Sequence, residues 1–514
     1  MTGGGLLVLV SYGSQNVILS GNPQMTYYFK IFKRYAHFSM ENVTIAMDGP
    51  NTLPYDNPIQ LRTKIQRIGD LLSDMIFSFE LPDIYSKAIG QMVGGTRQYE
   101  YEFQWVQAIG AAIINSAEFF IGGQSIQRFD GTYLYSKALL EYDTATLEKW
   151  NIMVGNTNEL TAPSAGAFSA SYASGPVYPT VVGQGGNIAN RPSIFGQTIH
   201  VPLNFWFTDA TSQALPLVAL QNQECEVVLT LNPVQALYTI LDPNGVRVAP
   251  RYQTVTNTLN NPVYGATEEQ TTIQNFLSDI GVTAPLTWPN FNPRIQCTFV
   301  YLSDEERVTF ATRPLTYVLP QLRILPLGPI TKTSDTYKLD VSNTVTRFIF
   351  IPRRTDWTNR NDFTNFTNWS SYPFAPLNIG TVGNGALTDF NKNFASGLII
   401  PNSQRDIIQS VRILCNGNEI QEEKPVNFLA KIYPFRYTTG NANAQIPIYT
   451  WAITSSKIQP SGSINSSRIT NFQMEVKYYA LPTNTNYVYD MNLYVEVLNF
   501  LVIASGSGAP KYVL

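Results

Sequence analysis

Histidine, cysteine and charge are all scarce in this chain. Its 514 residues include two histidines, His37 and His200, and three widely separated cysteines, Cys225, Cys297 and Cys415. An odd number of distant cysteines predicts no disulfide framework and fits folding in a reducing cytosol. A cupin-type metal site needs several histidines, and the two here lie in unrelated segments. We therefore expect no metal site.

Charged residues make up only 14% of the chain, against roughly 25% in an ordinary soluble domain. The net charge of -3 argues against a surface built to neutralise phosphates, so we expect no direct nucleic-acid binding. Neutral polar side chains must then cover much of the surface. This composition fits a protein whose flanks lie against identical neighbours, although a weakly charged soluble protein would also have it.

Membrane and catalytic signatures are missing as well. No apolar run approaches the roughly 18 residues that cross a bilayer, and Leu6 to Val10 is too short for a signal peptide. The sequence contains no Gly-rich phosphate loop, HExxH pair or G-x-S-x-G elbow. Asp304, Glu305 and Glu306 are consecutive, so on a helix they point in different directions and cannot converge on one substrate. We predict no catalytic, cofactor-binding or metal-binding residues and no enzyme activity.

Strand patterns dominate what is present. The stretch from Ile199 to Leu231 predicts two strands whose residues alternate between an apolar and a second face. The apolar faces are Ile199, Val201, Leu203, Phe205 and Phe207 in the first strand, and Cys225, Val227, Leu229 and Leu231 in the second. Similar alternation predicts strands at 59–65, 75–79, 295–301, 446–453, 472–478 and 491–505.

Two short segments predict tight hairpins. Glu118 to Ile126 turns at Gly122-Gly123, and Arg412 to Ile420 turns at Asn416-Gly417, which is the strongest short hairpin signal. Each hairpin is followed by a helical pattern, at 130–150 with Asp130 as N-cap and at 426–432.

A further short helix is predicted between the two halves of the chain. Ser303 and Glu306 form a capping-box pattern that opens it, and the helix ends before Pro314. The order hairpin, helix, strand, strand, insertion, strand then occurs twice, which is typical of a duplicated jelly roll. A length of 514 residues also favours two domains. We expect an N-terminal arm (1–23), a first jelly roll (24–302), a linker helix (303–313), a second jelly roll (314–504) and a C-terminal tail (505–514).

Five stretches of the chain carry a family resemblance. They are LVSYGSQNVILSGNPQMTYYFKIFKRYAHF (9–38), IQRIGDLLSDM (65–75), HVPLNFWF with LPLVALQNQECEVVL (200–229), FVYLSDEERVTFA (299–311) and QPSGSINSSRITN (459–471). In this order they resemble the major capsid proteins of the nucleocytoplasmic large DNA viruses, the double jelly-roll family of algal viruses and iridoviruses. The C-terminal FLVIASGSGAPKYVL departs from the glycine-rich segment and Tyr-Ser-Asn-like tail that are usual in that family.

The resemblance implies an all-β fold of two tandem eight-stranded barrels with long loop insertions and a few short helices. It implies a homotrimer of pseudo-hexagonal outline that tiles an icosahedral shell, with neighbouring capsomers, minor capsid proteins, penton proteins and the inner membrane surface as partners. The chain would be made and assembled in host cytoplasm and reside in the virion capsid. We read 156–191, 232–293 and 353–394 as outward insertions, which cost a barrel little because loop-closure entropy grows only logarithmically.

Three other features of the sequence allow more than one interpretation. The segment 27–38 interleaves aromatics with Lys30, Lys33 and Arg34, which can indicate base stacking, but three cations are few and we expect these aromatics to pack. A jelly-roll carbohydrate-binding protein is the alternative function, with Trp357 and Trp369 as sugar-stacking residues. The sequons at Asn42, Asn365, Asn368 and Asn465 are expected to arise by chance in a chain rich in Asn, Ser and Thr.

Overall fold

The computed structural model describes residues 3–10, 13–30, 32–86, 92–93, 96–97, 102–163, 192–241, 247–250, 272–277, 284–368, 405–440, 445–454, 459–481 and 487–512. By its internal contacts the chain divides into two units, Met1–Ser39 and Met40–Leu514. We describe the larger unit first and the smaller one by itself.

The first half of the larger unit forms a barrel of two facing sheets. One sheet has the strand order β1-β14-β3-β10, with β9 also paired to β3, and the other has the order β2-β11-β7-β8. These strands are β1 (Phe38–Ala46), β2 (Ile59–Lys64), β3 (Leu71–Glu80), β7 (Ile114–Ile121), β8 (Gln124–Phe129), β9 (Thr198–Pro202), β10 (Leu215–Pro216), β11 (Cys225–Leu231) and β14 (Arg294–Leu302).

The second half repeats this arrangement. Its sheets have the orders β15-β23-β17-β20, with β21 on β17 and β24 on β23, and β16-β22-β18-β19. The strands are β15 (Leu315–Pro326), β16 (Ser334–Lys338), β17 (Thr344–Arg354), β18 (Ile408–Cys415), β19 (Asn418–Pro425), β20 (Ile448–Thr450), β21 (Ile464–Asn465), β22 (Phe472–Tyr478), β23 (Tyr489–Ala504) and β24 (Ser507–Pro510).

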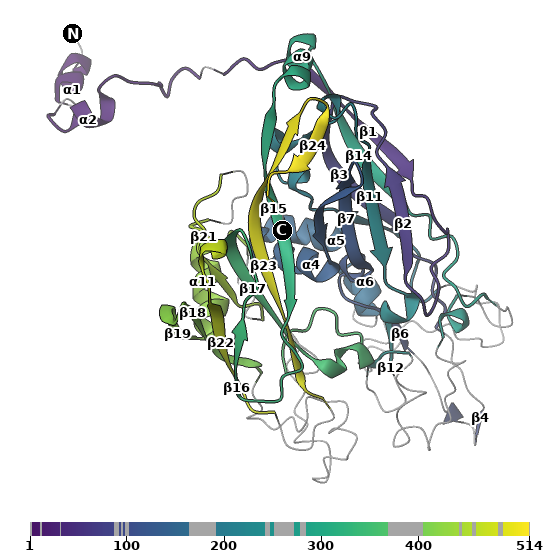
Figure 1. Ribbon diagram of the computed structural model, residues 1–514. Helices are drawn as coiled ribbons and strands as arrows, with labels where there is room; N and C mark the ends of the chain where they lie inside the picture. Colours follow the sequence, from purple (N-terminus) through teal and green to yellow (C-terminus); the bar gives the residue numbers. More distant parts are fainter. Residues whose placement is uncertain are drawn as a thin grey trace. The chain divides into compact units, whose positions relative to one another are not determined.

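Each barrel has eight strand positions if β9 with β10, and β20 with β21, share one position and the added strand β24 is not counted. Numbered along the chain, these positions follow the same order in both barrels. It is 1-8-3-6 in one sheet and 2-7-4-5 in the other. This is the jelly-roll order, so the predicted double jelly roll is confirmed. Figure 1 shows the two barrels side by side, the first in blue to teal and the second in green to yellow.

Short elements connect the strands. Small sheets join β6 (Glu102–Trp105), β12 (Tyr238–Leu241) and β13 (Arg247–Val248), and β4 (Met92–Val93) with β5 (Thr96–Arg97). Among the described residues of the larger unit the helices are α3 (Ile109–Ala112), α4 (Gly131–Glu141), α5 (Thr144–Met153), α6 (Asn158–Thr161), α9 (Asp304–Thr312) and α11 (Tyr433–Tyr437), with a π-helical turn η9 (Phe428–Ile432) before α11. The 3₁₀ turns described there are η2 (Trp206–Thr208), η3 (Thr211–Gln213), η4 (Leu217–Ala219), η5 (Val234–Ala236), η6 (Ile273–Asn275), η7 (Thr355–Asn359) and η10 (Ser466–Arg468).

Both predicted hairpins are confirmed. Gly122 and Gly123 have φ angles of +57° and +79°, and Asn416 and Gly417 have +49° and +83°. Positive φ at both central residues gives the turn twist that joins two antiparallel strands directly.

The predicted helix at 130–150 is two helices. Asp130 caps α4 as expected, by accepting a hydrogen bond from the backbone N–H of Tyr133. Asp143 then caps α5 by accepting from the N–H of Thr146, and this second cap divides the pattern. Helical spacing across a short break looks continuous in sequence, which explains the error.

The helix predicted after Ser303 is present as α9, but the capping box is not formed. The Ser303 side chain makes no cap hydrogen bond. Instead the Asp70 carboxylate accepts from the N–H of Leu302 at 2.9 Å and from Arg307 Nε at 2.9 Å. A carboxylate from the start of β3 therefore holds the beginning of this helix.

The first strand of the central stretch is shorter than predicted. β9 ends at Pro202, and the chain enters η2, where Phe205, Trp206 and Phe207 are all buried. The second strand is β11, as predicted, and buries Cys225, Val227, Leu229 and Leu231. Likewise the strand predicted at 446–453 shortens to β20.

The core of the first barrel extends across to the second. Its apolar cluster includes Ile349 and Ile351 of β17 and Tyr494 of β23. Phe348 and Phe350, which alternate with them, belong instead to the second barrel's own cluster. One sheet of the second barrel thus packs on both faces, and the two barrels share a continuous apolar contact.

Of the predicted insertions, residues 164–191 of the first, 242–246, 251–271 and 278–283 of the second, and 369–394 of the third lie outside the described residues. The described beginning of the third insertion is not a surface loop, because Arg353 and Arg354 are buried at the end of β17. Trp288, near the end of the second insertion, is also fully buried. These ends of the insertions belong to the barrel core.

The smaller unit contains two short helices, α1 (Gly4–Val10) and α2 (Asn16–Ser20), where we predicted a flexible segment. The aromatic residues that follow are exposed: Tyr27, Tyr28, Phe29, Phe32 and Tyr35. The prediction that they pack was therefore wrong for the single chain.

Candidate assembly surfaces

The helix α4 of the first barrel lies at the seam between the two barrels (Figure 1). The Asp130 carboxylate at its N-terminus accepts a hydrogen bond at 2.6 Å from the hydroxyl of Tyr494 on β23. At its other end Gly440 donates its N–H to the Leu140 carbonyl at 2.9 Å. A Cβ on Gly440 would come within 2.5 Å of the Leu140 backbone, so only glycine permits this approach.

Arg347 of β17 is the cation of a buried network at this seam. Its Nε donates to Glu496 Oε2 at 2.9 Å and its Nη2 to Glu496 Oε1 at 2.7 Å. The same Nη2 donates to Glu141 Oε1 of α4 at 2.8 Å, and the Tyr133 hydroxyl donates to Glu496 Oε1 at 2.8 Å. The network joins α4 to β17 and β23 through charge-assisted hydrogen bonds.

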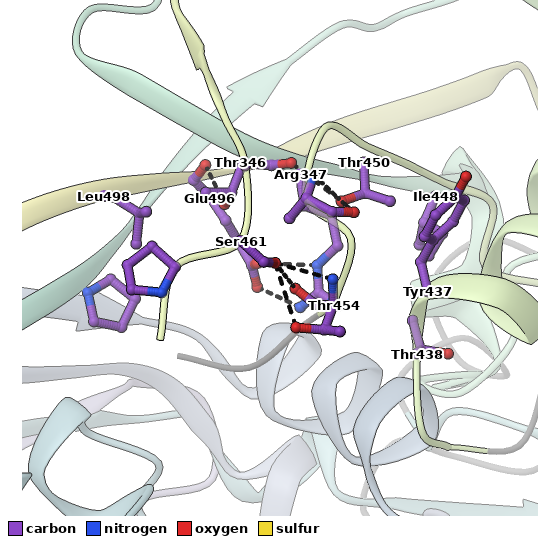
Figure 2. A pocket seen from close by; sticks show the side chains of 14 residues that line it. Thr346, Arg347, Tyr437, Thr438, Ile448, Thr450, Thr454, Ser461, Glu496 and Leu498 are labelled. Atoms are coloured by element: carbon purple, nitrogen blue, oxygen red, sulfur yellow. Dashed lines mark hydrogen bonds and ion pairs between the residues drawn. The ribbon is translucent and has the colours of Figure 1, made fainter. Parts of the chain in front are cut away.

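This network depends on its arginine, because one guanidinium faces two carboxylates. Burial alone lowers the pKa of Arg347, but Glu496 and Glu141 outweigh it and raise that pKa. Figure 2 shows Arg347 and Glu496 with Thr450 and Ser461 around a cavity of about 40 Å³. Such a cavity holds a few water molecules at most and no substrate.

The C-terminal residues form a second link across the seam. Ser505 and Gly506 turn the chain with φ angles of +52° and +80°, so that β24 pairs with β23. The N–H of Asn222, in the first barrel, donates to the Gly506 carbonyl at 3.0 Å, and Gln223 Oε1 accepts from the N–H of Gly508 at 2.7 Å. The described part of the predicted tail is therefore paired into the sheet.

The second barrel leaves one apolar face uncovered beside β19. Phe435 of α11 is 84% exposed, and Ile432 and Ile420 are 38% and 40% exposed. Lys431 and Arg436 are also exposed on the same segment. Large exposed apolar groups of this kind mark interaction surfaces.

The residues considered for chemistry are not brought together. His37 is exposed in the smaller unit, and His200 of β9 pairs with the Ser78 hydroxyl at 2.8 Å. Burial, followed by the charge of Arg294, lowers the pKa of His200. Among the described residues no His, Cys, Asp and Glu group could hold a metal ion.

The cysteines are unpaired thiols, and two of them are buried. Burial raises the pKa of both Cys225 and Cys297 to about 12, so neither is a nucleophile near neutral pH. Asp304 and Glu305 are exposed on α9, which places them in solvent as predicted. No helix in the described ranges has the length and apolar character of a membrane span.

The tryptophans considered for sugar stacking and the asparagines of the four sequons differ in their exposure and contacts. The guanidinium of Arg353 covers the Trp357 ring at 4.4 Å from its centroid, and Trp369 lies outside the described residues. Asn365 and Asn368 are buried, at 6% and 1% exposed, which does not suit glycan attachment. Asn42 and Asn465 are exposed.

Two family profiles cover most of the chain. The profile of the major capsid protein N-terminus matches residues 26–276, and that of the large eukaryotic DNA virus major capsid protein matches residues 306–509. The chain belongs to the major capsid proteins of large eukaryotic DNA viruses. Each profile falls on one jelly roll, so both halves of this capsid protein carry the family pattern.

Whole-length relatives agree. The major capsid protein of Chrysochromulina ericina virus is 24% identical, with 99% of this chain and 100% of the relative covered. That of Paramecium bursaria Chlorella virus 1 is also 24% identical, with 99% of each covered. Among solved structures, PBCV-1 VP54 superposes with a TM-score of 0.64 at 19% identity over 95% of this chain and 100% of that one. The Faustovirus major capsid protein gives 0.62 at 12% identity, over 96% and 94%. These likenesses show the fold.

The seam network and the bare face of this capsid protein were missed in the sequence. A signal for the first exists, because Arg347 and Glu496 each interrupt an apolar strand run. A charge in a buried strand must be paired, so the two residues were candidates for one ion pair. No comparable signal marks Phe435 as exposed, since its neighbours Tyr433 and Tyr437 are equally aromatic.

Proposed function

We propose that three copies of this capsid protein form a capsomer of pseudo-hexagonal outline and that capsomers tile an icosahedral shell. The repeat within the chain carries the proposal. In the first barrel the helix after the hairpin, α4, is covered by the second barrel. In the second barrel the equivalent segment, η9 with α11, buries Leu429, Ala430 and Pro434 but leaves Phe435 exposed on its outer side.

The two equivalent segments differ in that α4 is covered by a barrel of its own chain, whereas η9 and α11 are not. We infer that a barrel of another subunit packs against η9 and α11. Each chain would then place its η9 and α11 segment against the first barrel of the next. A heterologous contact of this kind closes into a ring if its rotation fits. Three chains bring six barrels, which supports the pseudo-hexagonal outline.

We further propose a structural role without catalysis, assembly in host cytoplasm, and contacts with minor capsid proteins, penton proteins and the inner membrane surface. The domain division given above stays a prediction. The contact boundary supports an arm that reaches residue 39, and the pairing of β24 supports a second barrel that reaches residue 510.

Light scattering of the purified chain is expected to give three times the 57.4 kDa mass of one chain. Phe435→Asp should dissociate this trimer, because full burial of a phenylalanine contributes about 1.5–3 kcal/mol and the new carboxylate would be buried unpaired. Val308→Asp is the matched control, since Val308 is 61% exposed on α9, outside the proposed contact. A monodisperse monomer of the unaltered chain at micromolar concentration would contradict the trimer, and a trimeric Phe435→Asp variant would contradict this surface.

Salt should have little effect on the trimer. Charged residues are only 14% of the chain, so the contact is expected to be mainly apolar and neutral-polar. Raising salt from about 0.1 to 1 M shortens the Debye length from roughly 10 to 3 Å, yet the mass by light scattering should not change. Dissociation in 1 M salt would mean that ion pairs hold the trimer together.

A further inference from the structure

A second, larger cavity lies at the seam between the barrels. Its volume is about 660 Å³, within the range of small-molecule sites. The first barrel supplies Asn115, the start of α4 and the turn at Asn232, and the second supplies β17, η7 and β23. If the contact between the barrels served only to hold them together, apolar side chains would be expected to fill this space. This wall instead carries amides, hydroxyls, the Asp130 carboxylate and one guanidinium beside its apolar side chains.

That guanidinium belongs to Arg353, whose side chain is almost completely buried. Arg353 is 8% exposed and lines the cavity. Its Nη2 donates to the Phe363 carbonyl at 2.7 Å and lies 3.5 Å from the Thr132 hydroxyl, while its Nε has no partner. A guanidinium has five N–H donors, so most of the donors of Arg353 are unused.

Arg353 differs in this from the other buried arginines of the described ranges. Arg347 pairs with Glu496, and both Arg354 and Arg360 pair with Asp356. No carboxylate among the described residues forms an ion pair with Arg353. Burying a cation without an anion is costly. The rings of Trp357, Phe363 and Phe366, with centroids 4.4, 5.6 and 4.9 Å from the guanidinium carbon, offset only part of that cost, so this position favours a negative group.

Two nearby carboxylates are engaged elsewhere. Asp490 lies directly opposite Arg353 across the β17–β23 ladder, but its Oδ1 accepts from the N–H of Met491 at 2.9 Å. Asp362 lies 3.4 Å from Arg360 Nε. Both attract Arg353 at longer range without contacting it.

Asp130, in the cavity wall, is also occupied. It accepts from the N–H of Tyr133 at 2.8 Å and from the Tyr494 hydroxyl at 2.6 Å. Burial raises the pKa of this carboxyl, while the hydrogen bonds from Tyr494 and Tyr133 and the charge of Arg353 act to lower it. Asp130 attracts Arg353, as Asp490 and Asp362 do, but none of the three forms an ion pair with it, which leaves room for an anion from outside the chain.

We propose that this cavity binds a small molecule carrying a phosphate or carboxylate group, held by Arg353. The planar guanidinium suits such an oxyanion because it can donate two parallel hydrogen bonds. The rest of the wall suits a polar body. Asn359, Asn492 and Thr358 supply hydrogen-bonding groups, and Trp357 supplies an aromatic edge. Because both barrels contribute, the bound molecule would also strengthen the seam.

Titration calorimetry on the full chain, at constant ionic strength, tests the proposal with inorganic phosphate, AMP and glucuronate. At least one probe should saturate one site per chain. Equal affinity for all three identifies the oxyanion alone as the ligand feature, and tighter binding of AMP or glucuronate identifies an organic anion. Failure of all three to saturate overturns the proposal.

Arg353 is too deeply buried for a clean deletion, so the key variant is Asn492→Asp. Asn492 of β23 pairs with Ile351 of β17, two residues before Arg353. Asn492 and Arg353 therefore lie on the same face of the sheet as diagonal cross-strand neighbours. Its new carboxylate would occupy the guanidinium and repel an anion, which should weaken binding at least about tenfold and raise the melting temperature of the unliganded chain. Gln459→Glu adds the same charge at an exposed position and should bind as the unaltered chain does. Unchanged affinity in Asn492→Asp would also overturn the proposal.

Discussion

Replacing Arg347 by methionine is expected to lower the free energy of unfolding by about 3–5 kcal/mol. The substitution removes the guanidinium that pairs with both Glu496 and Glu141 in the seam network, so that neither carboxylate keeps this partner. Removing one partner of a buried pair costs more than the pair itself contributes, because the remaining charge is buried uncompensated. Urea unfolding followed by tryptophan fluorescence measures the loss.

Arg412→Met is the matched control for that prediction. Arg412 also bridges two strands by pairing with a carboxylate, Glu475, but its side chain is 37% exposed. An exposed pair of this kind contributes about 0–1 kcal/mol. Adding Glu496→Gln to Arg347→Met should restore part of the loss, because one stranded charge is removed. Equal losses for Arg347→Met and Arg412→Met would show that burial does not set the strength of the seam network.

Local chemistry explains which parts of the fold were predictable. The turns at Gly122-Gly123 and Asn416-Gly417 were found because a two-residue hairpin needs residues that accept positive φ. The strand β11 was found because its apolar face is buried, while Glu226 and Thr230 on the other face are only partly buried. Hairpin, helix and strand signals of this local kind, recurring in the same order in both halves, indicated a duplicated jelly roll.

The errors arose where tertiary contacts decide the structure. Residues 203–207 alternate like a strand, yet the chain leaves the sheet, and the buried N–H of Trp206 bonds to Gln127 Oε1 instead of to a neighbouring strand. Period-two alternation cannot report a segment that is buried on all sides. The aromatics after Met25 fit a core equally well, and only the contacts of the folded chain show them exposed.

The candidate assembly surfaces were even harder to predict from the sequence than the fold. The seam joins Arg347 to Glu141, which lies 206 positions away, and to Glu496, which lies 149 positions away. A single sequence contains no information on which charges meet across such separations. The exposure of Phe435 likewise depends on how the two barrels pack. Its significance appears only from a comparison with the equivalent helix α4, which the second barrel covers.

Deleting Met1–Asn22 is expected to abolish or strongly impair shell assembly while leaving the melting temperature and the trimer mass nearly unchanged. The residues Met1–Ser39 form a contact unit of their own, so the larger unit should not need them to fold. Their apolar side chains are too exposed for an independent domain, with Ile18 at 89% and Leu19 at 87%. We infer that the arm docks on another component of the shell.

A full-length variant shows whether the assembly defect comes from the loss of the apolar side chains or only from the shorter chain. Replacing Leu6, Leu7, Ile18 and Leu19 by serine should reproduce the assembly defect of the deletion, because it removes the apolar groups and keeps the chain. Replacing Ser14 and Gln15 by alanine in the same segment is the control and should assemble normally. Particle yield by electron microscopy of co-expressing cells, with light scattering of the purified trimers, gives both readouts. A subunit can lose a docking arm without losing stability. If the truncated chain instead aggregates or fails to trimerise, the arm is part of the barrel fold and the boundary near residue 39 is misplaced.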